Sequence, residues 1–88
     1  MAVFVVLAEE PNEELAQKIA TEFPADFYKL TDRQWLISAD SIPQTVAEQL
    51  GVRTGKFGRV IVIKASTSAS GWHSKTVWEW LNQKAKIA

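Results

Sequence analysis

Three short segments of this chain are apolar at every position rather than at alternate positions. Residues 2–8 read AVFVVLA, residues 35–37 read WLI and residues 60–63 read VIVI. A strand with one solvent-exposed face alternates apolar and polar residues, so an unbroken apolar run predicts a strand covered on both faces. We therefore expect helices on one face of a small sheet. The other face is expected to carry the tryptophan-rich C-terminal segment or, as the second candidate, a partner subunit.

Amphipathic helices bury residues spaced three and four apart, and three segments of the chain show this spacing. The three apolar stripes are Leu15, Ile19 and Phe23; Ile42, Val46 and Leu50; and Val77, Trp78, Leu81 and Ala85. Asn12 can cap the first helix, Asp40 or Ser41 the second, and Ser74 the third. Gly51 suits the left-handed position just after the second helix.

The order of the predicted elements suggests a fold. Residues 26–30 and 34–39, joined by a turn at 31–33, form a hairpin, and residues 59–65 form the last strand. With right-handed crossovers, the order β-α-β-β-α-β predicts a ferredoxin-like α+β fold with an added C-terminal helix. The antiparallel strands then lie in the order four, one, three, two, and residues 1–88 form a single domain. Because this fold hosts many unrelated functions, it does not select one.

Composition narrows the functional classes. Ten basic and ten acidic residues cancel, whereas a protein that binds nucleic acid or anionic lipid usually carries a basic excess. The absence of cysteine excludes disulfides and thiolate metal ligands, and it favours a reducing cytoplasm. The first apolar run lacks a basic leader and continues into Glu9 and Glu10, so we expect a strand and neither a signal peptide nor a membrane span.

The segment from Ser66 to Thr76, STSASGWHSKT, is the best candidate for a ligand site. It leads from a strand to the start of a helix, where free backbone N–H groups and a lysine attract anions. The candidate binding residues are Ser70, Gly71, His73, Ser74, Lys75 and Thr76. The spacing of a P-loop is absent, and an ordinary loop and helix cap use the same residue types.

His73 is the only histidine of the chain. The expected topology places it near Asp40, Ser70 and Ser74, so a Ser-His-Asp arrangement is conceivable, but no nucleophile elbow accompanies it. One histidine without cysteines does not make a dedicated zinc site. The glutamates of residues 9–14 are explained by the preference of helix starts for carboxylates. We therefore predict no catalytic residue, no metal and no cofactor.

Three of the four tryptophans, Trp72, Trp78 and Trp80, lie close together near the C-terminus. At about 100° per helical residue, Trp78 and Trp80 point in different directions. Trp78 shares a face with Leu81, so Trp72 and Trp80 are the candidates for exposure, and tryptophan is enriched at interface hot spots. The alternative is that Trp80 lies along the margin of its own sheet.

The chain resembles small uncharacterised bacterial proteins with an apolar first strand followed by E-x-P-N, a Q-W-L strand and a final W-x-W helix. These are packing motifs, and the resemblance implies no activity. The expected topology is also similar to that of small CRISPR-associated nucleases. The aspartate that those nucleases carry at the end of their first strand is absent here, where Ala8, Glu9 and Glu10 stand, which argues against nuclease activity.

These observations together predict a small cytoplasmic domain that acts by protein–protein association rather than by catalysis. Its expected partner is a second copy of the chain or another protein, and Trp72 and Trp80 are the expected interface residues. The alternative function is binding of a small anionic or phosphorylated ligand at the loop before the last helix. An enzyme that uses His73 is the third hypothesis.

Overall fold

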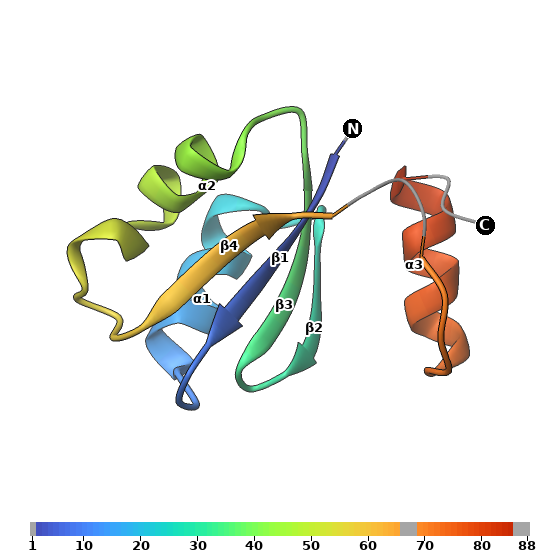
Figure 1. Cartoon of the computed structure of the whole chain (residues 1–88), viewed down its shortest axis with the longest axis horizontal. Helices are drawn as coiled ribbons and strands as arrows, with labels where there is room; N and C mark the ends of the chain where they lie inside the picture. The colour runs from blue at the N-terminus through green and yellow to red at the C-terminus, as the bar shows by residue number, and fades with distance from the viewer. Residues whose placement is uncertain (1, 66–68, 86–88) are drawn as a thin grey trace.

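A computed structural model describes residues 2–65 and 69–85 and shows an α+β chain with a four-stranded antiparallel sheet and three α-helices (Figure 1). The strands are β1 (Ala2–Ala8), β2 (Phe27–Thr31), β3 (Gln34–Ala39) and β4 (Val60–Lys64). The helices are α1 (Glu13–Glu22), α2 (Pro43–Leu50), the short 3₁₀ helix η1 (Val52–Thr54) and α3 (Lys75–Ala85). The predicted class and succession of elements are confirmed.

The strand order is β2-β3-β1-β4, so β1 is central and β2 and β4 are the two edges. Phe4 of β1 lies opposite Ile37 of β3 on one side and Lys64 of β4 on the other. The two edge strands differ in regularity. The register of β2 against β3 shifts between Lys29 and Thr31, whereas β4 stays in register with β1 along its whole length.

The sheet separates two hydrophobic cores. The larger core lies under α1 and α2 and contains the side chains of Phe4, Val6, Leu15, Ile19, Phe23, Trp35, Ile37, Val46, Leu50 and Val52. The smaller core lies under α3 and contains Val3, Leu36, Val77 and Leu81. The expectation that the C-terminal segment covers the second face is therefore confirmed for the part of the sheet that α3 contacts (Figure 1).

The start of α2 differs from the prediction. Neither Asp40 nor Ser41 caps the helix: the N-cap is Ile42, which has an extended backbone and no side-chain cap bond, and Pro43 is the first helical residue. Ile42 thus lies outside the buried stripe and is 56% exposed. The other end agrees with the prediction, because Gly51 adopts the left-handed conformation with φ of 78°.

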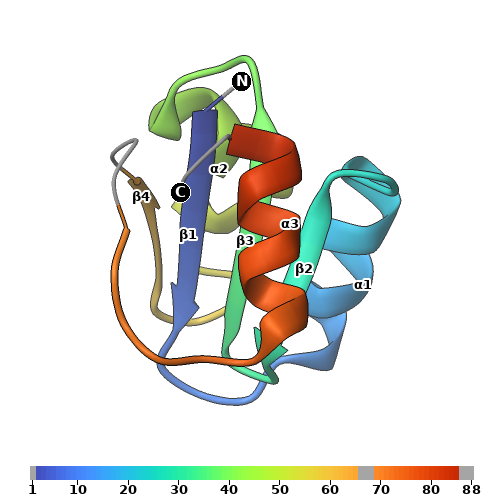
Figure 2. The same cartoon turned by 90° about the vertical axis from the view of Figure 1, so that its right-hand side faces the viewer.

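The expectation that residues 60–63 are covered on both faces is wrong. Val60 and Val62 pack against the larger core, but Ile61 and Ile63, on the opposite face, are 54% and 45% exposed. A helix is about 10–12 Å wide and strands lie about 4.8 Å apart, so one helix covers only about two strands. In Figure 2, α3 lies over β3, whereas β4 lies to its side.

Candidate functional site

The predicted ligand loop does not lie where the topology suggested. Lys84, near the end of α3, forms an ion pair of 3.0 Å with Asp26, just before β2. The helix therefore begins at the end of the sheet where β1 ends, and residues 69–74 run back along the sheet to reach it (Figure 2). Asp40 follows β3 at the opposite end, so the expected proximity of His73 to Asp40 is wrong. Residues 66–68 of the loop lie outside the described residues.

His73 is exposed and its ring is turned toward the start of α3. Its Nδ1 accepts a hydrogen bond of 2.8 Å from the backbone N–H of Ser74 and lies 3.3 Å from the Ser74 hydroxyl. That hydroxyl in turn lies 3.2 Å from the hydroxyl of Thr76. Within residues 2–65 and 69–85, then, His73 and Ser74 are brought together without the third member that a Ser-His-Asp arrangement needs.

The predicted anion-binding groups are partly occupied. Lys75 is exposed and its ammonium lies 3.8 Å from the carboxylate of Glu79, one turn along the helix. The backbone N–H groups of Val77 and Trp78 are directed at the carbonyl of Ser74. Both features weaken the attraction of this helix start for an anion, although binding at Ser70, Gly71, His73, Ser74, Lys75 and Thr76 stays a prediction.

The two predicted interface tryptophans differ in environment. Trp72 is 97% exposed and, with His73, borders a hollow of about 240 Å³ that Leu30 and Leu36 also line. Trp80 is half-buried, and its ring meets that of Tyr28 edge-on, with centroids 6.2 Å apart. Trp80 thus lies at the β2 margin of its own sheet, as in the alternative interpretation. Contact of either residue with a partner stays a prediction.

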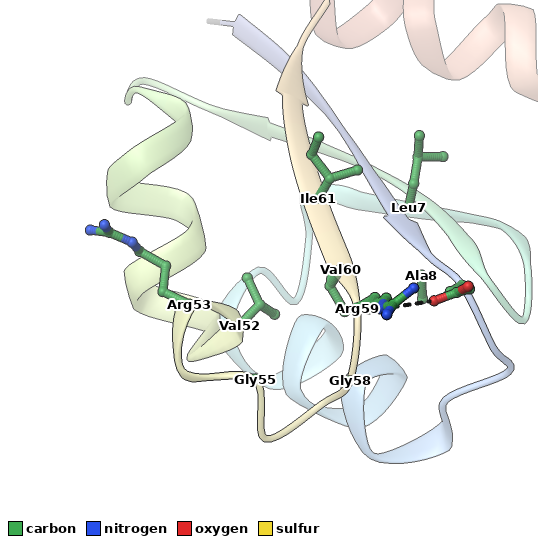
Figure 3. A pocket seen from close by; sticks show the side chains of 10 residues that line it. Leu7, Ala8, Val52, Arg53, Gly55, Gly58, Arg59, Val60 and Ile61 are labelled. Carbon is green, nitrogen blue, oxygen red and sulfur yellow. Dashed lines mark ion pairs between the residues drawn. The ribbon is translucent and has the colours of Figure 1, made fainter.

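A larger hollow, of about 570 Å³, lies around the start of β4 (Figure 3). It is lined by Leu7, Ala8, Glu9, Val52, Arg53, Gly55, Gly58, Arg59, Val60 and Ile61. Its loop wall contains Gly55 and Gly58, both with positive φ, and is tied to α1 by a hydrogen bond of 2.8 Å from Asn12 Nδ2 to the carbonyl of Phe57. The sequence analysis did not identify this site.

The arginines that line this hollow form ion pairs with nearby glutamates. Arg59 lies 3.7 Å from the carboxylate of Glu9, as the dashed line in Figure 3 shows, and Arg53 lies 2.9 Å from that of Glu48. Between these pairs the lining is apolar, with Leu7 and Ile61 on the α3 side of the sheet (Figure 3). The hollow therefore suits apolar side chains better than an anionic ligand.

A second hollow continues along β4 on the side of α2. It has a volume of about 340 Å³ and is lined by Pro43, Gln44, Ala47, Val52, Arg53, Val60, Ile61 and Val62. The two hollows share Val52, Arg53, Val60 and Ile61. The margin of β4 is thus hollowed on both faces; the first hollow is mainly apolar, whereas Gln44 and Arg53 give the second a mixed lining. The signal in the sequence was the run VIVI at residues 60–63, whose exposure depends on the position of α3.

Among residues 2–65 and 69–85, no cluster of histidine, aspartate and glutamate side chains has the arrangement of a metal site. In the same part of the chain no helix combines the length and apolar character needed to cross a membrane. No protein-family model matches the sequence, and no curated protein is significantly similar to it. The function has to be inferred from the geometry of the site.

Proposed function

We propose that this chain is a non-enzymatic protein–protein interaction domain that forms a homodimer through the margin of β4. The observation that carries the proposal is the exposure of two large apolar side chains, Ile61 and Ile63, on an edge strand. An edge strand presents a row of unpaired backbone groups that another strand can pair with. An apolar face beside such an edge adds a hydrophobic driving force to that pairing.

The contrast between the two edge strands supports β4 as the interface. Proteins protect exposed edges with charged residues, irregular pairing and short strands. The β2 edge has such protection in the exposed Lys29 and in the register shift beside it. β4 has four consecutive β-branched residues and no register shift, and its one charged residue, Lys64, lies at its end.

Two finer predictions accompany the proposal. Read from the β4 edge, the strand order is β4-β1-β3-β2, which supports classifying the fold as ferredoxin-like. The lack of cysteine supports a cytoplasmic location. The absence of catalytic activity is part of the proposal. His73, the residue on which an enzymatic hypothesis would depend, contacts only its sequence neighbour Ser74 among the hydrogen bonds of the described residues.

The test is sedimentation of the wild type and of two variants across a dilution series. Ile61→Lys places a charge in the proposed interface and should shift the protein to monomer, because loss of an interface anchor costs about 2 kcal/mol or more, about 30-fold in Kd. Gln17→Lys is the control, since Gln17 is exposed on α1, a helix that lines neither hollow beside β4. A wild type that sediments as a monomer at every concentration would contradict the proposal.

A further inference from the structure

We infer that β4 pairs antiparallel with β4 of a second copy, with Val62 on the two-fold axis, so that the two sheets join into one continuous sheet. This inference rests on the proposed function and deepens it, because it specifies the partner strand and the residue register.

The hydrogen bonds between β1 and β4 show which backbone groups of β4 are free. The N–H of Ala65 donates to the carbonyl of Val3 at 2.8 Å. The N–H of Glu9 donates to the carbonyl of Arg59 at 3.0 Å. Successive residues of an antiparallel strand bond to opposite sides, so the odd-numbered residues of β4 bond to β1. The residues whose N–H and C=O groups point away from the sheet are Val60, Val62 and Lys64.

In one register, the outward backbone groups of β4 form hydrogen bonds with the same groups of a second copy. With Val62 on the axis, Val62 pairs with its own copy and Val60 pairs with Lys64 of the second copy. Each of these is a pair in which both residues exchange N–H···O=C bonds, so every outward group of the strand is satisfied. With the axis at Ile61, Lys64 would lie beyond the end of the partner strand. With the axis at Ile63, Val60 would lie beyond it.

The same register covers the exposed isoleucines. Ile61 of one copy lies opposite Ile63 of the other in a pair without backbone bonds, where the Cα atoms approach to about 4.5 Å. Leu7 and Val5, which neighbour Ile61 and Ile63 on β1, border this cluster. The second copy thus covers Ile61 and Ile63, as the apolar pattern of the strand predicts. The chain's own α3 lies over β3 and does not extend to β4.

Charge also favours an axis at the centre of β4. The strand is flanked by Arg59 at its start and ends with Lys64. An axis at Arg59 or at Lys64 would put two like charges directly opposite each other, which destabilises a strand pair. With the axis at Val62, Lys64 lies opposite Val60 and Arg59 lies opposite Ala65, so no like charges oppose each other.

The assembly closes after two copies and has further surface to bury. A specific interface takes about 800 Å² from each partner, roughly a seventh of the 5654 Å² that this chain exposes. A strand pair alone is smaller, but α2 packs on β4, so pairing brings both α2 helices and their 340 Å³ hollows toward the axis. The outer edges of the joined sheet are then the two β2 strands, which Lys29 and the register shift protect from further addition.

Cysteine cross-linking tests the register, because the natural chain contains no cysteine. Ile61→Cys and Ile63→Cys are prepared separately, oxidised mildly alone and as a mixture, and analysed by non-reducing electrophoresis and mass spectrometry. In the mixture, Cys at 61 of one copy lies about 4.5 Å from Cys at 63 of the other, within reach of a disulfide. In each variant alone the two thiols lie diagonally, about 7–8 Å apart and beyond that reach. Lys29→Cys, on the other edge, measures cross-linking by random collision.

A disulfide-linked species that forms in the mixture well above the Lys29→Cys level, and not in either variant alone, supports the inference. Equal cross-linking in the single variants, or none in the mixture while light scattering shows a dimer, overturns the register and leaves the proposed homodimer intact. A wild type that is monomeric by light scattering overturns both.

A charge pair gives an independent readout. Ile61→Lys with Ile63→Glu in one chain sets two opposite charges across the axis, whereas Ile61→Lys with Ile63→Lys sets like charges there. Both double variants lose the isoleucine anchors, but the first should dimerise with a lower Kd than the second, because its charges attract each other across the axis. Equal Kd values for the two double variants, at unchanged circular dichroism, count against this register.

Discussion

The smaller core makes α3 the part of the fold that should separate most easily, and Leu81→Ala is the change that tests this. The Leu81 side chain is 8% exposed and packs with Val3, Leu36 and Val77. Truncation of a buried leucine to alanine costs about 2–5 kcal/mol, depending on how far the site relaxes.

The contacts that hold α3 on the sheet come from the smaller core, from the edge-on contact of Trp80 with Tyr28 and from the partly exposed pair of Lys84 with Asp26. A loss of about 2–5 kcal/mol is large for a core of four buried residues. Leu81→Ala should therefore release α3 while the larger core stays folded.

Native-state hydrogen exchange is the assay. In Leu81→Ala the amides of α3 should lose protection, while those of β1 and α1 keep the protection of the global unfolding reaction. Leu50→Ala is the control, because Leu50 is fully buried in the larger core and its truncation should lower the protection of all elements together. If Leu81→Ala also lowered all elements equally, the two cores would form one cooperative unit and the reasoning would be wrong.

Three further outcomes are expected. Trp80→Ala should lower the free energy of unfolding by about 1–2 kcal/mol, because the half-buried ring loses its edge-on contact with Tyr28. Trp72→Ala should leave it within about 0.5 kcal/mol, because that side chain is 97% exposed. Equal melting temperatures for the two variants would contradict this, and dissociation of the dimer by Trp72→Ala would add Trp72 to the interface. If the loop before α3 binds an anion, phosphate should raise the melting temperature beyond an equal ionic strength of chloride, and Lys75→Ala, but not the control Lys18→Ala, should reduce the rise. Gly51→Ala should destabilise the chain by about 1 kcal/mol, measured by urea unfolding, because φ of 78° disfavours a side chain.

Local patterns were enough to predict most of the elements. The spacing of Leu15, Ile19 and Phe23 predicted α1 and its buried face, and Asn12 caps that helix by accepting a hydrogen bond of 2.9 Å from the N–H of Leu15. Gly51 marked the end of α2. These features depend on contacts within a few residues, so the amino-acid sequence alone determines them. The predicted cap of α2 was wrong because Asp40 and Ser41 both have side chains that commonly cap helices, whereas the helix begins one residue later, after Ile42.

Tertiary structure decided where the last helix lies and therefore which surface is left open. The apolar run at residues 60–63 predicted a strand covered on both faces, whereas Ile61 and Ile63 are exposed on the face that α3 partly covers. α3 lies over β3, and one helix is too narrow to cover β4 as well. That position depends on contacts between residues far apart in sequence, such as Lys84 with Asp26, which no local pattern encodes. The exposed margin of β4 is a consequence of that position.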